Sequence, residues 1–473
     1  MKYPVTLNQE LTLIHQEYRW NLGLQPNANL IPSAFLLEGT LNIAALEKAL
    51  NCVIDRHVSL RLAFKKNDRR TPPEREILIC NLIADYSCAT GLYAQHCVNT
   101  AKLEIQVHFI ESLEPEEQEI EIENILRVSY KNPFNFSNPP FVRAHLFQLS
   151  HNRYFFVILV HHLVCDIYSS MILGRDWIIF YNSIVSNATP GLPRITRHFG
   201  DFALDQYENA TNGSYDSMLQ HWKNHIDQYS MAELNWEDLP PSFRGNIDPA
   251  SLGYESIALD GDLIQSWEIF AKSKKMTLFM LYMAACLIFF RKISKQSAVV
   301  IQSNLANKTN LDYLNSIGWF SNNWRIAADI SDHCTVQDIL SKSRAGVLEA
   351  IVNQSVPAQL LAKHSDELPK QKGNMLIACD LIQLYKINNS QQKSANLIIE
   401  HAPLPDFISS HMGDQLILRL SNYKTGGFFF AIYPKHRLGS GGISRILKEI
   451  VNIMTWCVNN EKENIHNYKW LDS

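Results

Sequence analysis

Apolar positions in the first 200 residues switch between the period of an amphipathic helix and that of a strand. In the stretch 41–57, LNIAALEKALNCVIDRH, they recur every three or four residues, which predicts a helix with Asn42 as its N-cap. A second helix is predicted over 123–136, ending near Asn132, which precedes a proline. Short apolar runs predict strands at 34–39, 59–64, 141–149 and 153–160. This alternation indicates the α/β class.

The second half of the chain repeats this plan. Its pattern predicts a strand at 255–259, a helix at 262–275, a buried helix from Thr277 to about Ile293, a strand at 298–303, a hairpin at 413–434 and a helix at 443–457. Between the halves, the segment 185–200 contains two prolines and two glycines and has little periodicity. It is therefore predicted to link two domains, at 1–184 and 201–473.

Composition narrows the class of protein. The chain has 473 residues, enough for two domains, and 46% of them are apolar. A net charge of −4 without an evident basic face disfavours nucleic acid as a partner. The longest nearly apolar run, 277–290, is too short to span a bilayer, and the N-terminus lacks the pattern of a secretory signal. We therefore expect no membrane partner, and nine cysteines without a CxxC pair predict a cytoplasmic protein with reduced thiols and no metal site.

The apolar segment 154–160 runs directly into two histidines, and an aspartate follows four residues after the second. In an extended segment His161 and His162 point to opposite sides, so at most one of them faces a given substrate. A neutral imidazole can accept a proton near pH 7. Asp166 can cap the helix predicted over 167–184, or it can pair with an arginine. In the alternative, structural interpretation, one histidine satisfies backbone groups and the other lies at the surface.

The segment HHLVCDIYS, which starts at His161, resembles the HHxxxDGxS motif of nonribosomal peptide synthetase condensation domains, in the superfamily of chloramphenicol acetyltransferase. Further segments are similar to other motifs of that family and occur in the family's order. They are VTLNQELTLIHQ at 5–16, RHVSLRLAF at 56–64, FGDFALDQ at 199–206, the apolar helix and strand within 277–309, and IGWFSNNWRI at 317–326.

The resemblance implies a fold of two chloramphenicol acetyltransferase-like lobes in a V-shaped arrangement, with a tunnel between them. An acyl or peptidyl carrier protein would present an acyl thioester on its phosphopantetheine arm at one end of the tunnel. A small-molecule amine or a carrier-bound acceptor would enter at the other end. No permanently bound cofactor is implied.

The same resemblance assigns roles to individual residues. His162 corresponds to the catalytic histidine, which accepts or shares the proton of the amine. The implied supporting residues are His161, Asp166, Asn322 at the tunnel floor, and an arginine that pairs with Asp166, either Arg61 or Arg325. Ile167 stands where the family has glycine, and its branched side chain is expected to narrow the tunnel and restrict the substrate.

Three functions are compatible with these features. The first is a free-standing condensation enzyme that joins a carrier-bound acyl or aminoacyl group to an amine, since no adenylation or carrier segment is recognised in the chain. The second is an O-acyltransferase that makes an ester from a carrier-protein or coenzyme A thioester. The third is an interaction module that has lost catalysis. The retained His161, His162 and Asp166 favour catalysis, whereas Ile167 slightly favours the third function.

Overall fold

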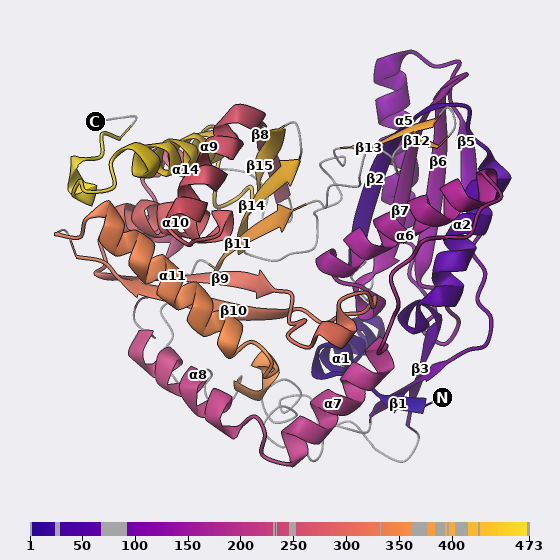
Figure 1. Ribbon diagram of the computed structural model, residues 1–473, viewed down its shortest axis with the longest axis horizontal. Helices are drawn as coiled ribbons and strands as arrows, with labels where there is room; N and C mark the ends of the chain where they lie inside the picture. Colours follow the sequence, from indigo (N-terminus) through magenta and orange to yellow (C-terminus); the bar gives the residue numbers. More distant parts are fainter. Residues whose placement is uncertain are drawn as a thin grey trace. The chain divides into compact units, whose positions relative to one another are not determined.

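The computed structural model describes residues 2–23, 29–67, 92–229, 232, 234–245, 252–331, 333–361, 376–383, 393–394, 397–402, 415–423 and 426–470. The chain forms two compact units (Figure 1). Unit 1 comprises Met1–Tyr215, Lys308–Ser321 and Lys386–His411, and unit 2 comprises Asp216–Asn307, Asn322–Tyr385 and Met412–Ser473. This division differs from the predicted one. The segment 185–200 connects two helices of unit 1, and two later segments return to unit 1, which no single linear boundary can describe.

Unit 1 contains a six-stranded mixed sheet with the order β12-β13-β2-β7-β6-β5, in which β5 and β6 are parallel and the other neighbours antiparallel. Its strands are β2 (Leu30–Gly39), β5 (Ile105–Phe109), β6 (Val142–Ser150), β7 (Arg153–His161), β12 (Lys393–Ser394) and β13 (Leu397–His401). A three-stranded sheet is formed by β1 (Lys2–Pro4), β4 (Tyr93–Cys97) and β3 (Leu62–Lys66). The helices are α1 (Leu7–Asn21), α2 (Ile43–Arg56), α5 (Pro115–Lys131), α6 (Ile167–Val185) and α7 (Phe199–Thr211).

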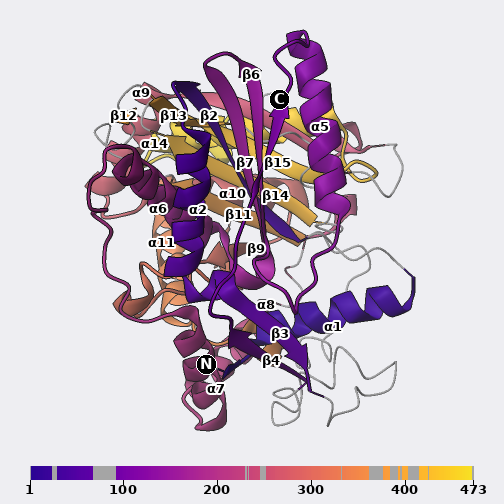
Figure 2. The ribbon, with the colours of Figure 1, turned by 90° about the vertical axis from the view of Figure 1, so that its right-hand side faces the viewer.

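Both faces of β7 are buried, which explains its continuous apolar sequence. On one face Phe156 belongs to the core that α2 and α6 cover, where Trp177 contacts Phe35 and Phe156 edge to face at 5.2 and 5.6 Å between ring centroids. On the other face Val157 and Leu159 pack with residues of α5. Figure 2 shows the strands of unit 1 between α5 on one side and α2 and α6 on the other. The end of β7 is therefore held firmly from two sides.

Unit 2 contains a second six-stranded mixed sheet, with the order β10-β9-β11-β14-β15-β8, in which β11 is parallel to both of its neighbours. Its strands are β8 (Leu252–Asp260), β9 (Ala298–Leu305), β10 (Asn322–Asp329), β11 (Leu376–Gln383), β14 (Gln415–Tyr423) and β15 (Gly426–Pro434). Its helices are α8 (Asp216–Tyr229), α9 (Gly261–Ser273), α10 (Leu278–Ser294), α11 (Val336–Val352) and α14 (Ser440–Asn459). The helix α10 is almost entirely buried, as its apolar run predicts, and its Tyr282 hydroxyl donates to the Leu418 carbonyl of β14 at 3.0 Å.

Most predicted elements are confirmed, including the N-cap of α2, where the Asn42 side chain accepts from the Ala45 amide at 2.9 Å. Two predictions were wrong in extent. The helix predicted over 123–136 begins earlier, at Pro115, because Glu114 and Glu117 form a capping box at its start. Its end at Lys131, with Asn132 as C-cap before Pro133, agrees with the end predicted near Asn132. The strand predicted over 59–64 begins as the 3₁₀ turn Val58–Arg61, and only β3 is extended.

Within the described residues no single helix is long and apolar enough to cross a membrane. The helices α9 and α10 reach such a length and apolar composition only as a pair, and the chain bends by 98° between them.

Candidate functional site

The two histidines lie where β7 gives way to a tight turn. His161 is the last residue of β7, and residues His162–Val164 form a 3₁₀ turn in which the Leu163 amide donates to the His161 Nδ1 at 3.1 Å. The His162 amide donates to the carbonyl of Asn29 at 2.8 Å. Because the strand ends between the two residues, their rings enter different surroundings, as the alternation of a strand predicted.

His161 is a neutral, buried side chain. Its ring is 2% exposed and packs edge to face against Phe136 and Phe134 at 4.9 and 6.0 Å. Burial lowers its pKa to about 3, and the neighbouring His162 and Arg143 act in the same direction. Since its Nδ1 accepts a hydrogen bond, the proton of the neutral ring lies on Nε2. The ring of His161 is thus held by aromatic packing and by a hydrogen bond from the backbone.

A cavity of about 570 Å³ in unit 1 has His161 in its wall. Aromatic rings make up much of the remaining wall, contributed by α1, β3, β4, α5 and the segment that follows α5; they are Trp20, Phe64, Tyr93, Tyr130, Phe134 and Phe136. Glu17 accepts hydrogen bonds from the Lys66 ammonium and the Tyr93 hydroxyl at this wall. The size falls in the range of small-molecule sites.

His162 lies against an indole rather than a carboxylate. Its ring is half-buried, and its centroid is 4.2 Å from that of Trp319, with the planes inclined by 50°. The Nδ1 atom is buried and has no hydrogen-bond partner on another residue of the described part of the chain; the only backbone interaction of the ring among the causes of its pKa shift is with His162 itself. Burial lowers the pKa of His162 below its ordinary value, while the Asp166 carboxylate acts in the opposite direction. The imidazole is therefore neutral near pH 7 and able to accept a proton.

Asp166 binds backbone amides. Its Oδ1 accepts from the Ser169 amide at 2.7 Å, which makes it the N-cap of α6. Its Oδ2 accepts from the amides of Phe320 and Ser321 at 2.9 and 3.0 Å. The carboxylate is 1% exposed, and three N–H donors together with the N-terminus of α6 compensate its charge.

The prediction that Asp166 pairs with Arg61 was wrong, since the carboxylate accepts from backbone amides and the Arg61 guanidinium is bonded elsewhere. The alternative partner, Arg325, stays a prediction. The Arg61 guanidinium donates instead to four carbonyl groups, those of Ile54, Asp55, Val98 and Asn99, at 2.8–3.2 Å. Arg325 lies in β10 of unit 2. Three backbone N–H groups already donate hydrogen bonds to this carboxylate, so its negative charge is compensated without a guanidinium.

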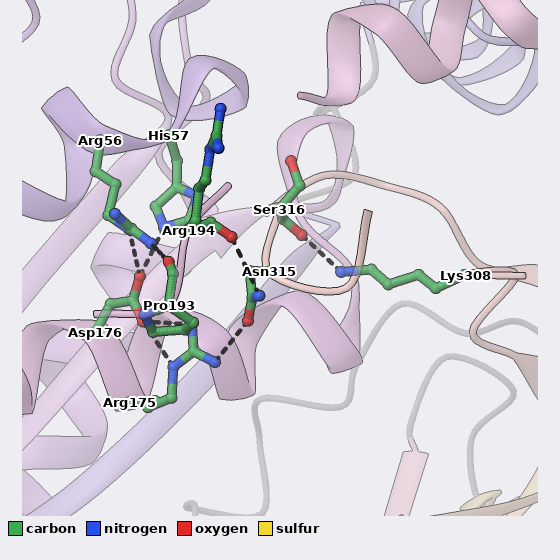
Figure 3. Close-up of polar contacts among 9 residues, drawn as sticks. All are labelled: Arg56, His57, Arg175, Asp176, Pro193, Arg194, Lys308, Asn315 and Ser316. Atoms are coloured by element: carbon green, nitrogen blue, oxygen red, sulfur yellow. Dashed lines mark hydrogen bonds and ion pairs between the residues drawn. The ribbon is translucent and has the colours of Figure 1, made fainter. Parts of the chain in front are cut away.

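Two further polar residues hold parts of this site, one the turn and the other the segment before Trp319, and sequence reasoning missed both. The Gln9 amide on α1 is fully buried and donates to the Leu163 carbonyl at 2.8 Å. The Lys308 ammonium donates to the Ser316 carbonyl at 2.6 Å (Figure 3). Burial lowers the pKa of Lys308 to about 8, while Asp166 raises it. Both residues lie in segments that carry the family resemblance, so a polar residue inside an otherwise apolar motif was the available signal.

The Lys308 ammonium also faces two aromatic rings. It lies 4.6 Å from the centroid of Tyr168 and 4.5 Å from that of Phe320. The residues on either side of Trp319 are thus held from several directions.

The segment RHVSLRLAF contributes a buried ionic cluster rather than a partner for Asp166. Arg56, His57 and Arg175 all surround the carboxylate of Asp176 on α6 (Figure 3), with Arg56 Nε and His57 Nε2 each 3.0 Å from its Oδ2. Burial lowers the pKa of His57 to about 4, although Asp176 opposes the shift. This cluster joins α2 to α6 and so stabilises the helix that Asp166 caps.

The last two predicted site residues have clear local roles. Ile167 is the first residue of α6, where a β-branched side chain fits the backbone, and it is half-buried. Asn322 is buried at the start of β10 in unit 2, and its amide donates to the carbonyls of Gln354 and Val356 at 2.8 and 3.2 Å. Asn322 therefore fixes a loop of unit 2. No group of three or more His, Cys, Asp or Glu side chains among the described residues could hold a metal ion.

Comparison with known proteins places this geometry in context. The sequence matches the Condensation domain family over residues 87–415. Surfactin synthase subunit 2 from Bacillus subtilis (strain 168) is 26% identical over 380 residues, which are 78% of this chain and 9% of that protein. Chondramide synthase cmdD from Chondromyces crocatus is 25% identical over 330 residues, 69% of this chain and 8% of that protein. The chain thus spans less than a tenth of the length of these relatives.

Solved structures with the same fold confirm the predicted fold class. The first condensation domain of the calcium-dependent antibiotic synthetase, in complex with a substrate analogue, gives a TM-score of 0.77 at 12% identity and covers 99% of both chains. The X-domain from teicoplanin biosynthesis, in its complex with OxyB, gives a TM-score of 0.71 at 17% identity, covering 99% of this chain and 96% of that one. Both neighbours share the two-lobed chloramphenicol acetyltransferase-like fold with this chain.

Proposed function

The chain belongs to the condensation-domain family, and from that premise we propose that it forms an amide bond between a carrier-protein-bound acyl or aminoacyl thioester and an amine, with His162 as the catalytic base. The amine nitrogen attacks the thioester carbonyl, so that a C–N bond forms and the C–S bond breaks. The proton that the nitrogen loses passes through the imidazole to the departing phosphopantetheine thiolate. The products are the amide and the free thiol.

The observation that carries this proposal is the neutral, half-buried imidazole of His162, which directly follows a strand whose two faces are both buried. Because its Nδ1 is buried, Nε2 is the nitrogen that remains for a substrate. An amine must be neutral to attack, and a neutral imidazole can take up its proton, which typically contributes about 10²–10⁴-fold to the rate. The rest of the acceleration would come from holding the two reactants together.

The test uses a carrier protein loaded with acetyl, octanoyl or phenylalanyl groups and a panel of amines and alcohols, with products followed by mass spectrometry. We expect amide products, and we expect His162→Ala to reduce turnover by at least about 10²-fold. His151→Ala is the matched control, because His151 is an exposed histidine in the turn before β7. Ester products alone would favour the O-acyltransferase. Full activity of His162→Ala would remove His162 from the mechanism.

One observation favours a second candidate, the interaction module. The X-domain that shares this fold was solved bound to OxyB, and Ile167 occupies the motif position where glycine is expected. A protein with this function would bind a partner enzyme and turn over none of the thioesters in the panel. The thioester assay therefore separates the two proposals directly.

A further inference from the structure

Among the described residues, no carboxylate and no carbonyl of another residue accepts a hydrogen bond from the His162 ring; the ring interacts with the backbone of His162 itself. In most sites where histidine acts as a base, a carboxylate or carbonyl accepts a hydrogen bond from the second ring nitrogen and fixes the tautomer and rotamer. Here the buried Nδ1 meets no side-chain acceptor among the described residues, the backbone interaction of the ring is with His162 itself, and Asp166 accepts hydrogen bonds from three backbone amides. The group in ring contact with the imidazole is the indole of Trp319, at 4.2 Å between centroids.

The backbone on both sides of Trp319 is fixed by the start of α6. The Ser169 hydroxyl donates to the Gly318 carbonyl at 2.8 Å and accepts from the Gly318 amide at 3.1 Å. The Asp166 carboxylate accepts from the amides of Phe320 and Ser321. The two anchoring side chains follow His162 by only a few residues, so the same helix end positions both rings.

Packing reinforces these hydrogen bonds. A Cβ atom on Gly318 would lie 2.2 Å from a ring carbon of Phe199, a distance that causes a steric clash. The backbone at Gly318 therefore packs directly against that ring and leaves no space for a side chain. The side chain of Phe320 is 1% exposed and packs against Phe199 and Phe202 at 5.2 and 4.9 Å. Trp319 is thus a half-buried residue between two tightly held neighbours, and its indole has little freedom to move away from His162.

We propose that Trp319 is a positioning and specificity-determining residue: its indole restricts rotation of the His162 imidazole and selects amines that are unbranched beside the nitrogen. The inference rests on the proposed function, since it assumes that His162 serves the amine. Two rings 4.2 Å apart leave no space for a substrate between them, so the nucleophile must approach the imidazole along its free edge, beside the indole. A branch on the carbon next to the nitrogen would meet the indole there.

The ring contact also has an electrostatic consequence. The face of an indole attracts a cation, so Trp319 stabilises the protonated imidazole and raises the pKa of His162 relative to an aliphatic neighbour. The other titratable groups near the ring are Asp166, which also favours the protonated form, and His161, which is neutral. Replacing Trp319 by leucine should therefore lower the pKa of His162.

A first experiment needs no substrate. A protonated imidazole quenches the emission of an adjacent indole, so the emission difference between the wild-type protein and Trp319→Phe should fall as pH decreases through the pKa of His162. His162→Gln should abolish that pH dependence. Trp456→Phe is the matched control, because Trp456 is also half-buried against an aromatic ring, that of Tyr468, at 5.3 Å. A Trp319 signal that titrates equally in His162→Gln would overturn the ring contact.

A second experiment tests selectivity with the amine panel of the proposed function. We expect Trp319→Leu to lower kcat by about 10-fold, to shift the acid limb of kcat/KM to lower pH, and to raise the relative rate with branched amines. Trp319→Phe, which keeps a ring, should stay closer to the wild type in all three. Unchanged kcat, pH profile and selectivity in Trp319→Leu would refute the inference while leaving the proposed function intact. If the wild-type protein forms no product, the proposed function fails, and the fluorescence titration still decides whether Trp319 contacts His162.

Discussion

Replacement of Asp166 by alanine tests how the turn after β7 is held. The substitution removes the carboxylate, so that three backbone amides each lose their hydrogen-bond acceptor. Two of these amides belong to the fully buried residues Ser169 and Phe320. Loss of the N-cap interaction at Ser169 costs about 1 kcal/mol. A buried N–H that loses its partner costs about 1–3 kcal/mol, and this applies to Phe320 and, with some access for water, to the half-buried Ser321.

Together these losses give an expected destabilisation of about 3–5 kcal/mol, a large part of the 5–15 kcal/mol that is typical of folded domains. The assay is urea unfolding followed by intrinsic fluorescence and by circular dichroism, because a chain of two units can unfold in more than one step. Asn42→Ala is the matched control, since it removes an exposed N-cap of the same unit and should cost about 1 kcal/mol.

A double-mutant cycle separates this explanation from an ion pair. If amides are the partners of Asp166, the effects of Asp166→Ala and Arg61→Ala on the free energy of unfolding should add within about 0.5 kcal/mol. A coupling energy well above that value, or an Asp166→Ala variant no less stable than Asn42→Ala, would refute the reasoning.

Two further predictions concern stability. Gly318→Ala should destabilise the protein by about 1–3 kcal/mol, because the added methyl group overlaps the ring of Phe199, whereas Gly191→Ala, with open space around it, should be nearly neutral; equal melting temperatures for the two variants would contradict this. Acid should also destabilise the fold. The pKa lies near 3 or 4 in four buried histidines, namely His57, His145, His161 and His225. Since an unfolded histidine titrates near 6.5, the unfolded chain binds more protons as pH falls from about 6.5 to 4, and the free energy of unfolding should decrease by up to about 1.4 kcal/mol per pH unit for each histidine. Urea midpoints at about pH 7 and 5 measure this slope, His225→Gln should reduce it, and an unfolding free energy independent of pH in this range would show that these histidines are not buried as neutral side chains.

Local pattern was sufficient for much of the fold. The period of apolar residues located β7, α2, α6 and α10, and side-chain chemistry identified the caps Asn42 and Asp166. Prediction was weaker where a helix is largely polar. The helix α5 begins in an acidic stretch whose signals are the capping glutamates and Pro115 rather than a hydrophobic stripe.

The sequence predicted only those residues of the candidate site that lie in one short segment, from His161 to Asp166. The motif located His161, His162 and Asp166, and the rule of alternating side chains separated the two histidines. It did not predict the partners of Asp166, because the amides of Phe320 and Ser321 lie more than 150 residues away in the chain, and every residue except proline has such an amide. An arginine can be identified in a sequence as a candidate ion-pair partner, whereas a backbone N–H cannot, because almost every residue has one.

Periodicity and capping chemistry act over a few residues, so the chain itself specified where β7 ends, which residue caps α6 and which imidazole follows the strand. Tertiary packing decided the rest. It brought the segment Lys308–Ser321 back to unit 1, placed Trp319 on His162 and directed two distant amides to Asp166. The physical reason is that hydrogen bonds and ring contacts between segments far apart depend on how the backbone is folded in space, which local spacing does not encode.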